Sequence, residues 1–221
     1  MGIYEFAGCV VSYEPLYGLL RRRMETYRSD TERQPDITLD GTKEDYEKLR
    51  KQYPHLSIEE CEYSCAGAEF YMKLLKHQGF MIHASAVEKE GKAYLFSAPS
   101  GTGKSTHAQL WRQTFKGEPI RIINDDKPAV CLQNGVFYAC GTPFSGKTDK
   151  NENRKAPIQG LCMLHRGKTN KIQKITSGEA LPLILPQTLF YGDEEETNLL
   201  LSFLDRFLQS VPVYKMECTM E

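Results

Sequence analysis

The segment FSAPSGTGKSTHAQLW, from Phe96 to Trp111, decides how this sequence is interpreted. A β-rich run leads into it, a glycine-containing loop forms its centre, and an amphipathic helical pattern follows. The loop matches the Gly-x-x-x-x-Gly-Lys-[Ser/Thr] pattern of phosphate-binding loops, with Ala98 in place of the first glycine. In such loops the backbone N–H groups and the positive end of the following helix hold phosphate oxygens. The segment therefore predicts a nucleotide phosphate site.

The residues of this loop have different expected roles. Lys104 would reach the β- and γ-phosphates, and the hydroxyl of Ser105 would bind Mg²⁺. The glycines would supply the backbone angles and the close approach that phosphate binding needs. The expected nucleotide-binding residues are Ser100, Gly101, Thr102, Gly103, Lys104, Ser105 and Thr106. ATP with Mg²⁺ is the expected cofactor pair; the alternative, a glycine-rich turn without a ligand, fits the flanking strand and helix patterns less well.

A second motif, RIINDDKP, contains a buried β-run that ends at Asp125 and Asp126. Carboxylates at the C-terminal end of a buried strand are expected where a metal–phosphate complex binds. One aspartate could bind Mg²⁺ while the other accepts a proton from an attacking hydroxyl. Asp126 is the preferred base, with Asp125 as the other candidate. The alternative interpretation is an ordinary turn at the end of a strand.

A third candidate is His83, in FMIHASAV, on the β-run before the strand of the loop. Alternation along a strand places Ile82 and Ala84 on the face opposite His83, so His83 could share its face with Ser85. Imidazole is the usual proton carrier near neutral pH. A histidine on a β-run is, however, more often a core residue, and both interpretations stay open on this evidence.

A polar segment, FSGKTDKNENRKAP, spans residues 144–157. Its cations Lys147, Arg154 and Lys155 could clamp a γ-phosphate or an acidic substrate, as cationic residues do in phosphoryl transfer. Its glycine suggests a loop that closes only over substrate. The alternative is a solvated basic loop.

The rest of the chain predicts an α/β fold with a mixed, partly antiparallel sheet. Residues 1–60 form a small α/β lobe: a strand over residues 4–13, a helix ending near Tyr27, a polar linker, a short strand and a helix closed by Pro54. Residues 61–221 form the domain of the phosphate loop, either separate from the lobe or integrated with it. Its expected features are a helix over residues 65–79, hairpins turning at residues 90–91, 134–135 and 167–170, helices near 181–185 and 195–210, and a final strand.

The overall composition restricts the class of protein. A net charge of -1 and a pI near 6.5 give no footprint for nucleic acid or an anionic membrane. The basic run Arg21–Arg23 is expected to be a solvated helix face. The 7 cysteines have no paired spacing, which indicates reduced thiols and a cytoplasmic protein. We expect no signal peptide and no membrane span.

Taken together, the motifs IHASAV, APSGTGKST, INDDKP and YACGTPFSGK through APIQGLCML resemble those of HPr kinase/phosphorylase and, more distantly, ATP-dependent phosphoenolpyruvate carboxykinase. Small HPr-kinase-like proteins, some associated with peptide-modification gene clusters, look more similar still. The resemblance covers roughly His83 to Leu164. It implies a phosphoenolpyruvate-carboxykinase-type fold, ATP with Mg²⁺, and phosphoryl transfer to a hydroxyl. Carried over by motif, Lys104 and Ser105 hold phosphate and metal, Asp125 and Asp126 share the metal and base roles, and His83 lies near the transferred group.

The departures from the family leave the acceptor open. At 221 residues the chain is too short for a carboxykinase, and the loop with which HPr kinases grip their protein is not recognisable. A serine of a protein or peptide follows from the resemblance. A small hydroxylated metabolite is the second possibility, and a nucleotide-sensing binding module with little turnover is the third. The family also implies a homo-oligomer.

Overall fold

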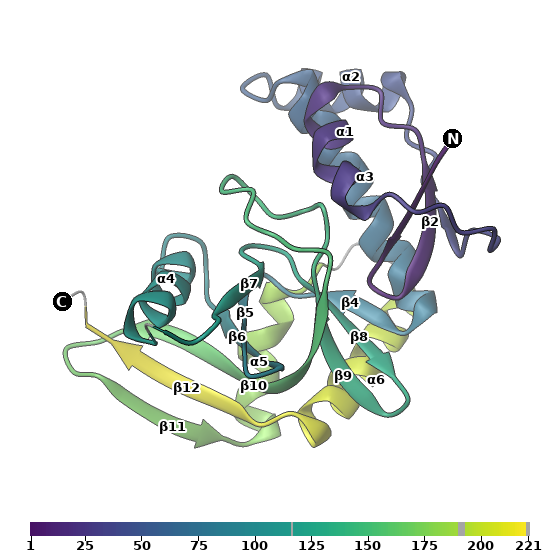
Figure 1. Cartoon of the computed structure of the whole chain (residues 1–221). Coiled ribbons are helices and arrows are strands. Elements are labelled where there is room, and N and C mark those ends of the chain that lie inside the picture. Colours follow the sequence, from purple (N-terminus) through teal and green to yellow (C-terminus); the bar gives the residue numbers. More distant parts are fainter. Residues whose placement is uncertain (116, 190–192, 220–221) are drawn as a thin grey trace.

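The computed structural model describes residues 1–115, 117–189 and 193–219. The chain has a mixed α/β fold (Figure 1). In chain order the elements are β1 (Gly2–Phe6), β2 (Cys9–Tyr13), α1 (Gly18–Met24), η1 (Glu25–Tyr27), β3 (Ile37–Thr38), α2 (Lys43–Gln52), α3 (Ile58–Leu74), η2 (Leu75–His77), β4 (Gly79–Met81), β5 (Ala84–Lys89), β6 (Lys92–Ser97), α4 (Lys104–Thr114), β7 (Arg121–Asn124), β8 (Ala129–Gln133), β9 (Val136–Cys140), β10 (Lys155–Arg166), β11 (Lys171–Ile175), α5 (Ser177–Ile184), η3 (Leu185–Gln187), α6 (Glu194–Ser210) and β12 (Val213–Cys218).

Within the described residues the strands form a small sheet of three strands and a large sheet of nine. The small sheet has the order β1-β2-β3, and the large one the order β4-β8-β9-β10-β6-β5-β7, with β12 between β10 and β11. The large sheet is mixed, as the sequence predicts, because β10 is parallel to β6 and β12 but antiparallel to β9. The expected hairpins at residues 90–91 and 134–135 are confirmed, since they join the antiparallel pairs β5–β6 and β8–β9.

The order of β6, β5 and β7 assembles one edge of the large sheet. β5 is antiparallel to both of its neighbours, with Ala84 opposite Ser97 of β6 and Ala86 opposite Asn124 of β7. The C-terminal ends of β6 and β7 therefore lie beside the N-terminal end of β5. The phosphate-loop motif, the two aspartates and His83 follow or precede these strand ends, so the topology brings them to the same edge.

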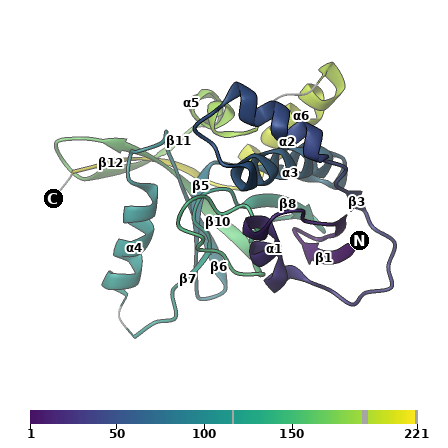
Figure 2. The ribbon, with the colours of Figure 1, turned by 90° about the horizontal axis from the view of Figure 1, so that it is seen from above.

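Hydrophobic side chains cover both faces of the large sheet. On one face Leu95 belongs to a core cluster that includes residues of α5 and α6, where Phe207 packs edge-on against Phe80 and Phe137. On the other face Phe96 packs with Trp111 of α4. Figure 2 shows α4 and the pair α5 and α6 on opposite sides of the sheet. The alternation predicted around His83 is confirmed, because Ile82 and Ala84 are fully buried in the α5–α6 cluster.

The N-terminal elements share a third cluster with the large sheet. Its aromatic centre contains Phe6, Phe70 and Phe144, with ring centroids 4.7 Å apart for Phe6–Phe70 and 5.8 Å apart for Phe70–Phe144. The expected domain boundary at residue 60 falls inside α3, which continues to Leu74. A division into two domains therefore stays a prediction, and the buried cluster joins the two parts.

Three expected elements differ in the structure. Residues 4–13 are two strands, because Ala7 (φ 53°) and Gly8 (φ 81°) form a tight hairpin turn that the composition does not signal. Helix α3 begins at Ile58 instead of near residue 65, because Ser57 and Glu60 form a capping box. The expected hairpin at residues 167–170 is wrong: β12 lies between β10 and β11 and pairs with both.

Among the described residues, none of the helices has the length and the apolar character that crossing a bilayer requires.

Candidate functional site

The loop between β6 and α4 leaves a set of hydrogen-bond donors free. The first amide N–H of α4 with a backbone acceptor is that of His107, which donates to the carbonyl of Gly103. In the described part of the chain, no protein acceptor takes the N–H groups of residues 103–106. Gly103 also provides no side-chain cap, and its φ of 115° suits glycine. Free amides at the positive end of a helix suit an anion such as phosphate.

Lys104 is folded back onto its own loop. Its side chain is buried, and Nζ donates to the carbonyl oxygen of Ala98 at 2.9 Å and, at 3.5 Å, to that of Pro99. Burial lowers the pKa of Lys104, while the negative charges of Asp126 and Asp125 act in the opposite direction. The ammonium group is therefore held by neutral carbonyls but lies within electrostatic reach of both aspartates.

Asp125 is buried and its carboxylate is fully engaged. Its Oδ1 accepts a hydrogen bond from the hydroxyl of Ser85 at 2.8 Å, and its Oδ2 accepts one from the hydroxyl of Thr148 at 3.0 Å. Its own N–H donates to the carbonyl of Lys150. This aspartate is fixed by neighbours on β5 and on the 144–157 segment.

Asp126 is more accessible than Asp125 and faces two basic side chains. Its Oδ1 lies 3.3 Å from Nε2 of His83, and its Oδ2 lies 3.6 Å from Nζ of Lys127. Burial alone would raise the pKa of Asp126, but the hydrogen bond from His83 and the charges of Lys127 and Lys104 outweigh that effect and lower it. Asp126 is therefore a carboxylate at neutral pH.

The side chain of Asn124 stabilises the turn in which Asp125 and Asp126 lie, a role that we did not predict. Its buried side-chain oxygen accepts the N–H groups of Asp126 at 3.0 Å and Lys127 at 2.8 Å. Its amide group donates to the carbonyl and the hydroxyl of Thr142. An asparagine just before a strand-end turn is a sequence signal for such a bond to the backbone, so this role could have been found.

His83 is oriented by a partner distant in sequence. Its Nδ1 lies 3.1 Å from Oε1 of Gln187, and its backbone N–H donates to the carbonyl of the same glutamine. The hydroxyl of Ser97, the last residue of β6, donates to the carbonyl of His83. No sequence signal connects Gln187, which lies in the short helix η3, to this site.

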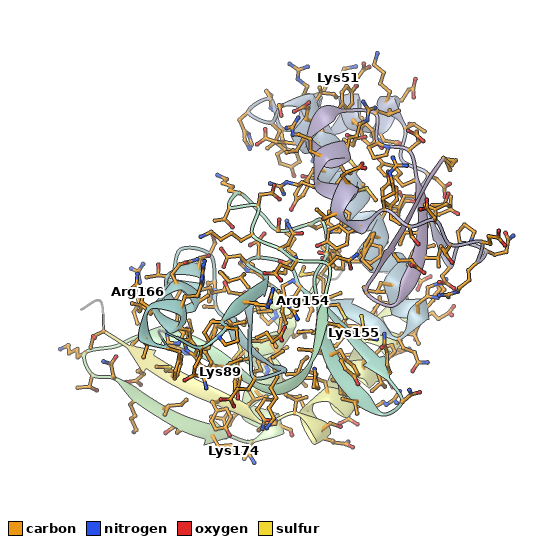
Figure 3. The ribbon with its side chains drawn as sticks, viewed as in Figure 1. Lys51, Lys89, Arg154, Lys155, Arg166 and Lys174 are labelled. Carbon is orange, nitrogen blue, oxygen red and sulfur yellow. The ribbon has the colours of Figure 1, made fainter. Side chains whose placement is uncertain are left out.

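The cations expected on the 144–157 segment have other contacts. Nε of Arg154 lies 2.7 Å from Oε2 of Glu88, which is near the end of β5 that is far from His83. Nζ of Lys155 donates to Oε1 of Gln133 at 2.5 Å. Figure 3 labels both cations. Lys147 is exposed.

The structure thus brings together His83, Lys104, Asp125 and Asp126. Arg154 and Lys155 have contacts elsewhere. The substrate role of these two cations, like that of Lys147, stays a prediction.

A different cation contacts the loop between β6 and α4. Nη2 of Arg166, the last residue of β10, donates to the carbonyl of Gly101 at 2.7 Å, and Figure 3 shows Arg166 beside α4. The parallel pairing of β10 with β6 brings the ends of both strands to the same edge.

The residues present provide few ligands for a metal on their own. Over residues 1–115, 117–189 and 193–219, no group of three or more His, Cys, Asp and Glu side chains could hold a metal ion. Mg²⁺ at this edge would therefore depend on the hydroxyl of Ser105, on the aspartates and on oxygen atoms of a bound phosphate chain.

Comparisons with known proteins add little to this geometry. No protein-family model matches the sequence. No curated protein matches it either. Among solved structures, the HPr(Ser) kinase/phosphatase from Coxiella burnetii is similar with a TM-score of 0.36 and 10% sequence identity, over 64% of this chain and 86% of that chain. At these values we draw no functional conclusion from the likeness.

Proposed function

We propose that this chain is an ATP-dependent kinase that transfers the γ-phosphate of ATP to a hydroxyl group. One observation carries the proposal: three motifs that are separate in the sequence meet at one edge of the sheet. Lys104 is within electrostatic reach of both aspartates, and His83 contacts Asp126. A phosphate-binding lysine beside a carboxylate pair is the arrangement that phosphoryl transfer requires.

Phosphate binding would use the donors that the protein leaves free. The N–H groups of residues 103–106 would surround the phosphate oxygens, and Lys104 would exchange its carbonyl partners for the β- and γ-phosphates. The lowered pKa of Lys104 reflects burial without a bonded anion, and a bound phosphate would supply that anion. Ser105, the second residue of α4, would bind the metal on the phosphates through its hydroxyl.

Ser105 and Asp125 would hold Mg²⁺ against the phosphates, and the metal would supply neutralisation of charge on the phosphate oxygens. Of the aspartates, Asp125 has both of its oxygens occupied by hydroxyl donors, so it suits a fixed position behind the metal. Asp126 is the more accessible carboxylate and suits the acceptor hydroxyl. Because its pKa is lowered, Asp126 is a weak base, and we propose that it acts mainly by orienting that hydroxyl.

The preferred acceptor is a serine of a protein or peptide, by the sequence resemblance described above. A hydroxylated metabolite is the alternative acceptor. Both use the same reaction at the same site, so the assay must separate them by the size of the labelled product.

The test uses ATP labelled at the γ-phosphate, Mg²⁺, the purified chain and extract of its source cells. Lys104→Ala and Asp126→Asn serve as inactive controls. Label on a polypeptide that both variants fail to transfer supports a protein or peptide kinase, and label in small molecules other than phosphate supports a metabolite kinase. Nucleotide binding without transfer to any fraction would contradict the kinase and indicate a nucleotide sensor.

A further inference from the structure

Residues 145–151 form a segment that contacts both aspartates. The hydroxyl of Thr148 donates to Oδ2 of Asp125 at 3.0 Å. Gly146 packs on Asp126 so closely that an added Cβ would lie 2.7 Å from Oδ2 of that aspartate. Gly146 also has a φ of 69°, which favours glycine. The position of this segment therefore decides how much room each carboxylate has.

Arg23 of α1 holds this segment from the N-terminal part of the chain. Its Nη2 donates to the carbonyl of Gly146 at 2.7 Å, and its Nε lies 3.1 Å from Oδ1 of Asp149. The Asp149 contact lacks hydrogen-bond geometry, because Nε of Arg23 has no hydrogen-bond acceptor, so the bond to Gly146 is the directional one. The side chain of Arg23 is only 8% exposed.

The expectation that residues 21–23 form a solvated face is therefore wrong for Arg23. Its neighbours Arg21 and Arg22 are exposed, as predicted. Helical geometry explains the difference, because consecutive residues project about 100° apart and only one of the three can face both α3 and residues 145–151.

Tyr63 of α3 provides a second anchor for the same segment. Its hydroxyl accepts the N–H of Gly146 at 3.0 Å, and the guanidinium of Arg23 lies over its ring, 4.8 Å from the centroid. The ammonium of Lys127 lies 5.3 Å from the same centroid, and 3.6 Å from Asp126. Gly146 is thus bonded at both its N–H and its carbonyl by side chains of α3 and α1.

We propose that Arg23 is a positioning residue that anchors residues 145–151 against Asp125 and Asp126, together with Tyr63. This inference rests on the proposed function for its catalytic meaning. It assigns a role to residues 1–60: they hold the segment that sets the room around the carboxylates of the kinase site. The hydroxyl of Tyr27, which bonds to Asn151, adds a further contact from the same part of the chain.

Arg23→Ala, Arg23→Lys and the matched control Arg22→Ala test the anchor in the full-length chain. Arg22 belongs to the same basic run and helix, so Arg22→Ala changes the net charge by the same amount as Arg23→Ala. Because Arg22 is exposed, its removal breaks no contact with residues 145–151. The first measurement is amide hydrogen exchange of Gly146 and Asp125, whose N–H groups donate to Tyr63 and to the carbonyl of Lys150 in the segment. We expect about tenfold or greater loss of protection in Arg23→Ala, because one bond to Gly146 and one ion pair disappear, and unchanged protection in Arg22→Ala.

The second measurement is kcat and KM for the transfer of labelled phosphate. We expect Arg23→Ala to lower kcat about 10- to 100-fold with little change in KM for ATP, because the carboxylates are displaced while the phosphate donors are untouched. Arg23→Lys should recover part of the loss, since lysine keeps the charge but not the guanidinium geometry. Tyr63→Phe removes only the hydroxyl that accepts the N–H of Gly146, and it should reduce the protection of Gly146. This variant provides the test if Arg23→Ala fails to fold.

The two measurements separate the anchor from the reaction. Unchanged exchange of Gly146 and Asp125 in Arg23→Ala and Tyr63→Phe would overturn the anchor. Lost protection with an unchanged kcat would overturn the positioning role. If the wild-type chain transfers no phosphate, the proposed function fails, and the exchange data alone decide whether Arg23 anchors the segment.

Discussion

Nε2 of His83 lies 3.3 Å from Oδ1 of Asp126, whereas the adjacent Asp125 contacts the hydroxyl of Ser85 instead. Two neighbouring carboxylates thus have different surroundings, one facing a histidine and the other held by hydroxyl groups. Different environments give chemically similar groups different roles.

Asp126→Asn should abolish phosphoryl transfer and leave binding of ATP with Mg²⁺ nearly unchanged. The amide is similar in size but cannot accept a proton or carry the charge that orients a hydroxyl. Asp125→Asn should instead destabilise the fold by about 1–3 kcal/mol, because a buried NH₂ group would face a hydroxyl donor. Single-turnover transfer and urea unfolding of both variants measure the two effects. Equal losses of activity and stability in the two variants would contradict the assignment.

His83→Ala should shift the acidic limb of the pH–kcat profile to higher pH. The hydrogen bond from His83 helps to lower the pKa of Asp126, so its loss lets burial raise that pKa, and Asp126 ionises only at higher pH. The profile of transfer against pH measures the shift. His55→Ala, which changes an exposed histidine, is the control and should leave the profile in place.

The stability that ionised Asp126 contributes should depend on pH in a defined direction. Its folded pKa lies below the value of about 3.9 expected in the unfolded chain, so this stability is present above pH 4 and is lost as pH falls through the folded pKa. Because His83→Ala removes a cause of the lowered pKa, wild type and variant should differ most above pH 4. Urea unfolding between pH 3 and pH 7 checks this, and a difference that grows as pH falls would contradict it.

Lys104→Ala should weaken binding of ATP with Mg²⁺ by about 100-fold or more, since a charge-assisted contact to the phosphates is lost. The free energy of unfolding without nucleotide should change by only about 1 kcal/mol, because the buried ammonium has neutral carbonyl partners in this state. Calorimetric titration with a non-hydrolysable ATP analogue measures the first effect, and thermal unfolding the second. Lys92→Ala, at an exposed position on β6, is the matched control.

Arg166→Ala should weaken nucleotide binding about 3- to 10-fold. Arg166 donates a hydrogen bond to the carbonyl of Gly101, so the loop between β6 and α4 would lose one of the bonds that fix its conformation. Titration with the same analogue measures the change against Lys168→Ala, an exposed cation just beyond β10. Equal affinities in Arg166→Ala and Lys168→Ala would show that the hydrogen bond from Arg166 to Gly101 has no part in binding.

Gly141→Ala should destabilise the fold by about 2–4 kcal/mol. An added Cβ would lie 1.8 Å from the carbonyl oxygen of Glu152, so the backbone next to the site would have to move. Gly178→Ala is the control, because nothing lies within 4 Å of its added Cβ, and it should be neutral or stabilise α5 by up to about 1 kcal/mol. Urea unfolding of both variants measures the contrast.

The sequence predicts which residues meet at one edge of the sheet better than it predicts the connections of the sheet. Residues that follow the strands, such as Lys104 after β6 and Asp126 after β7, are marked by local patterns of charge and glycine. They lie at one edge of the sheet once the strands pair. Position in the sheet has no such local mark. The pairing of β12 between β10 and β11 depends on contacts across the whole domain, so the turn after Arg166 looks like that of a hairpin.

The missed residues of the site illustrate the same limit. Asn124 carries a local signal, because asparagine before a turn bonds to the backbone. Gln187, Thr148 and Arg23 carry none, since each reaches the site from a different element and only the folded chain brings them near. Arg23 in particular is indistinguishable from Arg22 until the face of α1 that packs on α3 is known.

β10 pairs with β9 through residues 155–157, with β6 from Ile158 to Met163 and with β12 from Leu161 to Arg166, and its register shifts between Ile158 and Gly160. The register of β9, β6 and β12 relative to one another therefore depends on this one strand. An insertion of one residue after the shift would exchange the two faces of the strand and carry Arg166 away from Gly101. Over evolution, length changes should accumulate in the turn at residues 167–170 and be excluded from β10.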